Sequence, residues 1–245
     1  MIFMKKFTLI TGASRGIGRS IAIKFANAGT NLIIISKSNY DDLLETKSLC
    51  ESSGNICHCY KCDVSQYDEI VNLKKSLTKY NMEISCIINN AGICHFGLTQ
   101  DMEVLEWQNI INTNFSSVFY VCKAFLPDML HQQSGCIINI SSVWGNIGAS
   151  CEVAYSASKG GVNSFTKALA KELAPSHINV NAIACGAIDT NMNNRLSVEE
   201  RSSLENEIPY GRMGLDYEVA ELAYNIFKSP NYLTGQIITL DGAWT

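Results

Sequence analysis

Tyr155 and Lys159 give the most direct indication of chemistry in the sequence. They stand four residues apart, which places both side chains on one face of a helix. A tyrosine with a pKa of about 10 is a poor acid or base near neutral pH, but a neighbouring ammonium favours the phenolate and lowers that pKa. Ser142, expected at a strand end, would donate a hydrogen bond to a carbonyl oxygen. The three side chains predict proton transfer to a polarised carbonyl, with Tyr155 as the acid.

A glycine-rich turn supplies a second chemical signal. The predicted strand Phe7–Thr11 runs directly into Gly12, Gly16 and Gly18, and a helical pattern follows. Glycines at this spacing permit a tight turn and the close approach of a pyrophosphate, whose charge suits the N-terminus of the helix. This turn is therefore predicted to bind a dinucleotide, which would supply the hydride for a carbonyl carbon.

The end of the second predicted strand distinguishes between the two nicotinamide dinucleotides. In such folds an acidic residue about 20 positions beyond the glycines binds the ribose 2′-hydroxyl, whereas a basic residue suits a 2′-phosphate. Here the strand ends in Ser36, Lys37 and Ser38, with no acid, and Arg15 offers a second positive charge from the first turn. The residues favour NADPH over NADH.

The same turn also spells a rival motif. Residues 12–16 match G-x-S-x-G, the nucleophile elbow of α/β-hydrolases, with Ser14 as the nucleophile. That chemistry requires an acid and then a late histidine, and the last histidine here is His177. The elbow also normally follows a strand in the middle of the sheet. A serine hydrolase using Ser14 is therefore the less favoured alternative.

Hydrophobic periodicity predicts the elements that position these residues. Seven short runs rich in Ile and Val are predicted strands: Phe7–Thr11, Asn31–Ser36, Asn55–Lys61, Ile84–Asn89, Cys136–Ser141, Ile178–Ala184 and Gln236–Leu240. Helical patterns between them include Gly16–Ala28, Leu43–Glu51 and Asp68–Tyr80, with Asp41 or Asp42 capping the second and Gly54 ending it. This alternation predicts one doubly wound α/β domain over residues 1–245, a parallel seven-stranded sheet with helices on both faces.

Composition narrows the class of protein. The net charge of −4 gives no general attraction to nucleic acid or to an anionic membrane. Charged residues make up 17% of the chain against 47% apolar residues, which excludes intrinsic disorder and favours a large buried surface. No apolar run approaches the roughly 18 residues of a spanning helix, and the first ten residues do not form a signal peptide. The ten cysteines are then best interpreted as reduced thiols of a cytoplasmic protein.

Four further segments, together with TGASRGIG, make the chain resemble the short-chain dehydrogenase/reductase family over essentially its whole length. They are Asn89–Gly92, Asn114 within NTNFSS, Ser142, and Tyr155–Lys159. The resemblance implies a Rossmann fold, a nicotinamide cofactor and a homotetramer. It assigns Ser142, Tyr155 and Lys159 to catalysis and Asn114 to a proton relay. The cofactor residues it implies are Gly12, Ser14, Arg15, Gly16, Ile17, Gly18, Lys37, Asp63, Val64, Asn90, Ala91, Gly92, Tyr155, Lys159, Ile188 and Thr190.

One departure from the family pattern concerns the chain after the sixth strand. Family members usually have Pro-Gly there, and this chain has Cys185 and Gly186. A proline would fix the backbone that enters the nicotinamide pocket, whereas cysteine leaves it free. The departure bears on the placement of Ile188 and Thr190.

The ending YLTGQIITLDGAW is similar to 3-oxoacyl-acyl-carrier-protein reductases, which implies fatty acid biosynthesis and acyl carrier protein as the partner. Docking of that acidic carrier needs basic residues near the pocket mouth. At the matching places this chain has Gln132, Gln133 and Ser176, with His131 and His177 nearby. The electrostatic attraction for a carrier protein is therefore weak.

A narrower resemblance competes for the substrate. The stretch SSVWGNIGASCEVAYS is similar to reductases of the 5-aminopentanone modification on elongation factor P. Glu152, three residues before Tyr155, is expected beside the substrate, where a carboxylate would favour an amine-bearing ketone and disfavour an anionic one. An ordinary surface or subunit contact is an equally good interpretation of Glu152. Trp144 is a candidate pocket wall, although a packed core aromatic is the commoner role.

Two remaining segments invite interpretation. Residues 191–207 are polar, follow the strand expected at the nicotinamide, and are a candidate lid over the substrate, although an exposed helix without function fits as well. Cys57, His58, Cys59 and Cys62 resemble a metal cluster, but strand alternation points Cys57 and Cys59 one way and His58 the other. We therefore expect buried small side chains and no metal site.

Overall fold

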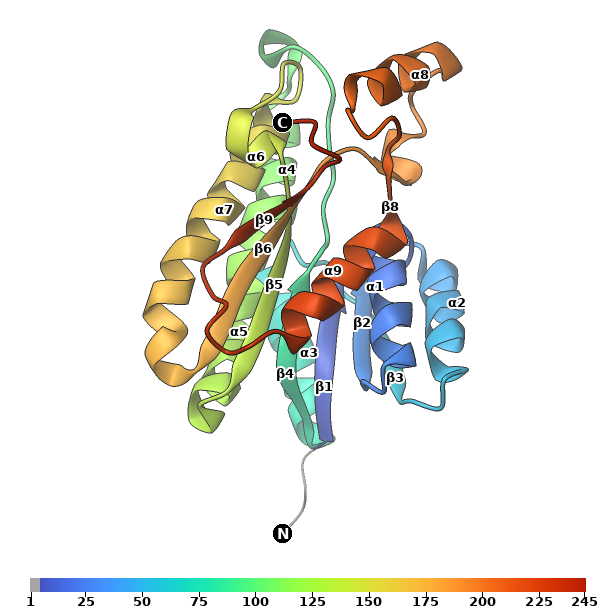
Figure 1. The fold of residues 1–245 in the computed structure, drawn as a ribbon. Helices are drawn as coiled ribbons and strands as arrows, with labels where there is room; N and C mark the ends of the chain where they lie inside the picture. The colour runs from blue at the N-terminus through green and yellow to red at the C-terminus, as the bar shows by residue number, and fades with distance from the viewer. Residues whose placement is uncertain (1–4) are drawn as a thin grey trace.

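The computed structural model describes residues 5–245 and contains the predicted parallel sheet. Its seven strands lie in the order β3-β2-β1-β4-β5-β6-β9 (Figure 1). Their bounds are β1 Lys5–Thr11, β2 Leu32–Ser36, β3 Cys57–Lys61, β4 Met82–Asn89, β5 Gly135–Ser142, β6 Ile178–Cys185 and β9 Ile237–Leu240. All seven sequence runs became strands. The inner strands, such as β2 and β6, have Ile and Val side chains that are buried on both faces, whereas the edge strands β3 and β9 are only partly buried.

Helices cover both faces, as predicted for a doubly wound sheet. The helices are α1 Gly16–Asn27, α2 Tyr40–Glu51, α3 Tyr67–Lys79, α4 Val104–Ile111, α5 Ser117–Gln132, α6 Trp144–Ile147, α7 Val153–Leu173, α8 Val198–Glu207 and α9 Asp216–Lys228. Side chains of α3, α5 and α7 pack on one face, and those of α1, α2 and α9 pack on the other. Among residues 5–245, no helix combines the length and the apolar character needed to cross a bilayer.

Alternation along the strands separates these two cores. Phe7 belongs to the core under α3, α5 and α7, whereas Cys57 belongs to the core under α1, α2 and α9. The ring of His58 lies 5.9 Å from that of Phe7, on the face opposite Cys57. The predicted divergence of Cys57 and His58 is confirmed. All ten cysteines lie in the described part of the chain and are free thiols.

One predicted boundary of helix α2 was wrong, and the other is confirmed. Helix α2 begins at Tyr40, and Asn39 occupies its cap position with a φ of 57°, so neither Asp41 nor Asp42 is the cap. Both aspartates lie in the first turn, where carboxylates interact favourably with the helix N-terminus. The helix ends at Glu51, as predicted, and Gly54, with a φ of +82°, donates its N–H to the Glu51 carbonyl oxygen in the turn that follows.

A small second sheet has no counterpart in the sequence prediction. Strand β7, Ile188–Asp189, pairs in parallel with β8, Gly214–Leu215. The pair closes the base of the excursion 190–213, which carries α8 away from the main sheet (Figure 1). Two-residue strands are too short to produce a detectable alternation in sequence.

Candidate active site

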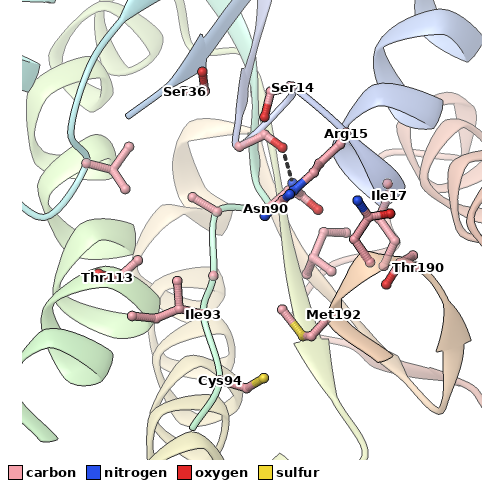
Figure 2. A pocket seen from close by; sticks show the side chains of 18 of the residues that line it. Ser14, Arg15, Ile17, Ser36, Asn90, Ile93, Cys94, Thr113, Thr190 and Met192 are labelled. Atoms are coloured by element: carbon pink, nitrogen blue, oxygen red, sulfur yellow. Dashed lines mark hydrogen bonds between the residues drawn. The ribbon is translucent and has the colours of Figure 1, made fainter. Parts of the chain in front are cut away.

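The main cavity lies where the strand order reverses. The chain proceeds from β1 to β2 on one side, and β4 pairs with β1 on the other, so the loops after β1 and β4 diverge and leave a crevice. A cavity of about 510 Å³ opens there. Figure 2 shows Ser36 at one end of it and Cys94 at the other. All sixteen residues implied for the cofactor line this cavity, as does Ser142.

Asn90 holds the two diverging loops together. Its side-chain amide donates to the carbonyl oxygens of Thr11 and Gly12, each at 3.0 Å. In return, the Thr11 hydroxyl oxygen accepts hydrogen bonds from the backbone N–H groups of Asn90 and Ala91, also at 3.0 Å. The strand ends at the floor of the cavity are thus fixed to each other before any ligand binds.

The glycine turn has the form a pyrophosphate requires. Gly12 has a φ of +65°, a left-handed conformation that side chains rarely adopt. A Cβ on Gly18 would lie 2.3 Å from the Gly12 carbonyl oxygen, so the helix packs directly against the turn. The first residues of α1 line the cavity, and no side chain caps that helix end. Its free N–H groups and its dipole suit an anion, so these residues fit a dinucleotide.

Lys37 and Asp63 face each other across the adenosine end of the cavity. The Lys37 ammonium lies 2.9 Å from a carboxylate oxygen of Asp63. Burial by itself would raise the pKa of Asp63, but hydrogen bonds from Lys37 and Ser65 outweigh it and hold that pKa below its usual value. Lys37 is more than half exposed, so the ammonium is available to a ligand that competes with Asp63.

Ser142, Tyr155 and Lys159 meet at the other end. Ser142 is the last residue of β5, and Tyr155 lies in the first turn of α7 with Lys159 one turn later. The Lys159 ammonium lies 5.6 Å from the centre of the Tyr155 ring and donates a 2.8 Å hydrogen bond to the Ile140 carbonyl oxygen. The three side chains therefore lie close together in the structure, as predicted.

The pKa of Tyr155 is raised in the structure, whereas the sequence predicted that it would be lowered. Burial raises it above its usual value, and the hydrogen bond with Ser142 only partly opposes this effect. Burial also lowers the pKa of Lys159 to about 8, because removal from water disfavours the ammonium. The i,i+4 spacing correctly placed the ammonium near the ring, but the depth of the site reverses the expected shift.

Asn114 has a bridging position behind this group. It lies in a π-helical turn, Asn112–Ser116, between α4 and α5, and only 1% of its surface is exposed. Its amide exchanges two 2.8 Å hydrogen bonds with the backbone of Ile93 and donates to the Ser158 hydroxyl at 3.1 Å. Ser158 in turn donates to the Tyr155 carbonyl oxygen. Asn114 does not line the cavity; it joins the loop after β4 to α7.

The two predicted substrate residues also lie outside the cavity lining. Trp144 packs its ring 4.8 Å from that of Trp244, so the structure places it in an aromatic pair instead of a pocket wall. Glu152 forms an ion pair with Arg195 at 3.2 Å. In the predicted lid 191–207, only Asn191, Met192 and Asn193 reach the cavity, whereas α8 is solvent-facing.

Several lining residues were missed. Ile93 and Cys94 immediately follow the Asn-Asn-Ala-Gly segment, and their adjacency was an available signal. Asn109 and Thr113 come from α4 and the π-helical turn, and no local pattern marks them. Cys185, noted only as a departure, lines the cavity, and burial raises the pKa of its thiol to about 12.

The expected carrier-docking positions do not flank the cavity. Residues 131–133 precede β5 and residues 176–177 precede β6, so they lie at the edge where these parallel strands begin. The cavity lies at the edge where the strands end. His177 is therefore remote from Ser14, and no histidine of residues 5–245 lines the cavity. Ser14 lacks the base that a serine hydrolase requires.

Comparisons with known proteins agree with this geometry. A family model described as short chain dehydrogenase matches residues 6–201. The chain is 40% identical over 243 residues to a Bacillus subtilis protein called uncharacterized oxidoreductase YmfI, covering 98% of this chain and 99% of that protein. It is 37% identical over 243 residues to the 3-oxoacyl-acyl-carrier-protein reductase FabG of Chlamydia trachomatis, with 98% of each chain covered.

A solved structure gives the same result for the fold. The crystal structure of a short-chain type dehydrogenase/reductase from Mycobacterium marinum superposes with a TM-score of 0.92 at 33% identity, covering 98% of this chain and 95% of that one. The resemblance drawn from the motifs is confirmed. The chain belongs to the short-chain dehydrogenase family of oxidoreductases.

Proposed function

We propose that the protein is an NADPH-dependent reductase that converts a ketone to a secondary alcohol, with a 3-oxoacyl group on acyl carrier protein as its substrate. The observation that carries this proposal is the position of Ser142, Tyr155 and Lys159 at one end of a cavity whose other end is a dinucleotide-type glycine turn. When bound, a nicotinamide cofactor supplies the hydride.

The chain's own residues would orient and protonate the substrate. The Ser142 hydroxyl would donate a hydrogen bond to the ketone oxygen, which polarises the carbonyl and fixes its distance from Tyr155. Tyr155 would then give its phenolic proton to the nascent alkoxide. Because burial raises the pKa of Tyr155, this residue is protonated near neutral pH, as the acid in a reduction must be. Lys159 would stabilise the phenolate that remains.

The preference for NADPH is proposed from charge. Lys37 and Arg15 line the cavity, and the Lys37 ammonium, which is more than half exposed, is open to a phosphate that competes with Asp63. We expect Lys37→Ala to weaken NADPH binding about tenfold and to leave NADH binding within about twofold, because only the 2′-phosphate requires the ammonium. Titration of each dinucleotide against the variant measures this, with Lys61→Ala as the matched control. Equal losses for both dinucleotides would contradict the assignment.

A second substrate has a specific observation in its favour. Glu152 lies three residues before Tyr155, and its charge acts on the phenol of that residue, although its side chain does not line the cavity. An amine-bearing ketone, such as the 5-aminopentanone group on elongation factor P, would suit that charge better than an acyl chain. The pairing of Glu152 with Arg195 reduces this advantage, which is why the acyl substrate is placed first.

The experiment that distinguishes the two proposed substrates compares two ketones in separate assays. Oxidation of NADPH is followed with an acetoacetyl thioester and, in parallel, with a simple amino-ketone of similar length. A higher kcat/KM for the thioester supports acyl metabolism. A higher value for the amino-ketone supports the translation-factor substrate. If the protein reduces neither ketone, the proposed reductase is overturned.

We further propose that the protein is a cytoplasmic homotetramer. It would act on a small or carrier-bound ketone and bind neither nucleic acid nor membrane. The family resemblance supports the assembly, and the ten free thiols support a reducing compartment. The proposed substrate lid is residues 191–207, supported by the three residues at its start that line the cavity.

A further inference from the structure

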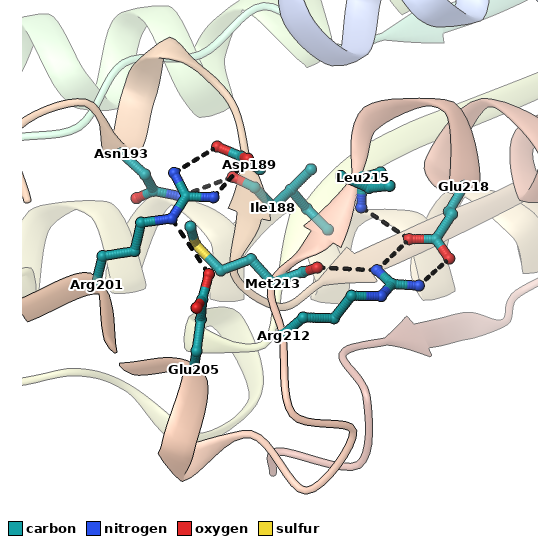
Figure 3. A network of polar contacts seen from close by, with 9 residues as sticks. All are labelled: Ile188, Asp189, Asn193, Arg201, Glu205, Arg212, Met213, Leu215 and Glu218. Carbon is teal, nitrogen blue, oxygen red and sulfur yellow. Dashed lines mark hydrogen bonds and ion pairs between the residues drawn. The ribbon is translucent and has the colours of Figure 1, made fainter. Parts of the chain in front are cut away.

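The excursion 190–213 is fixed at its base. Strands β7 and β8 bring its two ends together. Arg201 of α8 forms two hydrogen bonds, at 3.0 and 2.5 Å, with the Asp189 carboxylate at the start, and Arg212 forms a bidentate pair with Glu218 at the return (Figure 3). The described contacts therefore hold the stem of this segment without involving the reactive end of the cavity.

One residue reaches from the segment to the reactive end. Arg195 places a guanidinium nitrogen 3.2 Å from Glu152, immediately before α7. Its guanidinium carbon also lies 4.4 Å from the centre of the Phe96 ring, on the loop after β4. These two loops are already joined, because the Gly97 N–H donates to the Cys151 carbonyl oxygen at 2.9 Å. Arg195 thus connects the excursion to both loops around the substrate.

The carboxylate that Arg195 contacts is poorly hydrated and close to Tyr155. Burial raises the pKa of Glu152, and the Arg195 charge opposes that rise. An unpaired charge at such a site is costly, which favours the closed position of Arg195. The negative charge of Glu152 also raises the pKa of Tyr155, one helical turn away. Pairing with Arg195 offsets that influence.

The other groups that face Tyr155 lie outside the excursion, although the Arg195 charge also lowers the pKa of the Cys94 thiol against the larger effect of burial. Lys159 comes from the same helix, Cys185 from β6, and Cys94 from the loop after β4. Burial raises the pKa of both thiols, so they are neutral near neutral pH. Ser142 is uncharged and lies on β5. Glu152 is therefore the charged neighbour of Tyr155 whose partner belongs to the excursion.

We propose that Arg195 is a positioning residue: its ion pair with Glu152 and its stacking on Phe96 latch the excursion 190–213 over the reactive end and couple that closed state to proton transfer by Tyr155. The coupling rests on the proposed function of Tyr155, whereas the latch itself does not.

Hydrogen exchange tests the latch without any substrate. Loss of the contact by Arg195→Met or by Glu152→Gln is expected to speed amide exchange in residues 190–197 about threefold or more in the free protein. Exchange in the sheet strands serves as the internal reference and should not change. Wild-type protection of residues 190–197 in both variants would overturn the latch.

The pH profile tests the coupling. In alcohol oxidation Tyr155 must accept a proton, so the rate rises as pH passes its apparent pKa. Arg195→Met leaves the Glu152 charge unpaired, and the rising limb is expected to move up by about half a pH unit. In a Glu152→Gln background, Arg195→Met should leave the rising limb of the pH profile where it is. A purely structural role would lower activity equally in both backgrounds.

Arg201→Met is the matched control, because it removes an arginine pair from the same excursion but at its stem. It should change exchange in α8 and leave the pH limb in place. An unshifted limb in Arg195→Met, or an equal shift in the Glu152→Gln background, would overturn the coupling. A wild-type protein that turns over no ketone or alcohol would refute the proposed reductase instead, and the exchange result would then decide the latch alone.

Discussion

Tyr155→Phe is expected to lower kcat by about a thousandfold or more, while NADPH binding stays within about twofold of the wild type. The substitution removes only the hydroxyl that would protonate the alkoxide, and the ring keeps its place beside Lys159. No other described side chain at that end offers the same proton, because Ser142 is a far weaker acid and the Lys159 ammonium donates to the Ile140 carbonyl oxygen. Steady-state turnover and a fluorescence titration of NADPH measure the two quantities.

A second tyrosine provides the control for this result. Tyr232 is 99% exposed and remote in sequence from the site, so Tyr232→Phe should retain full activity. Thermal unfolding of Tyr155→Phe should shift only slightly, because the substitution removes one buried hydrogen bond, the one with Ser142. Retention of more than about a tenth of wild-type kcat by Tyr155→Phe would rule out the proposed acid.

Gly18→Ala is expected to weaken NADPH binding at least tenfold and to lower the free energy of unfolding by about 2 kcal/mol. Gly18 is buried, and its new Cβ would lie 2.3 Å from the Gly12 carbonyl oxygen and 2.5 Å from the Asn90 amide nitrogen. The turn and Asn90 must move apart, and both line the cavity. Isothermal titration of NADPH and urea denaturation measure the two effects.

Gly29→Ala separates stability from binding. Gly29 has a φ of +88° with nothing within 4 Å of a new Cβ, and it lies beyond the far end of α1. The strained backbone should lower the free energy of unfolding by about 1 kcal/mol, with no change in NADPH affinity. Wild-type NADPH affinity in Gly18→Ala would show that the close packing of helix and turn is not needed for the cofactor.

Local patterns predicted most of the fold. The inner strands of the main sheet are buried on both faces, so a short Ile- and Val-rich run was enough to identify them, as at Ile33–Ile35 and Ile137–Ile140. Helix boundaries were less accurate. At Asn39 a residue in a left-handed conformation starts α2 without any side-chain cap, and propensities do not encode that choice.

The chemical groups of the site and their local order can be predicted from the sequence alone. Tyr155 and Lys159 are four residues apart, and the glycines lie beside the first helix. Both patterns are local, so they can be recognised without knowledge of the fold. The protonation and the partners of these groups depend instead on how distant segments pack together. Burial raises the pKa of Tyr155, which the sequence predicted to be lowered. Trp144 packs against Trp244. Glu152 forms an ion pair with Arg195, which lies 43 residues away in the sequence. Solvation and long-range contacts depend on which distant segments meet, and for that reason no local pattern contained them.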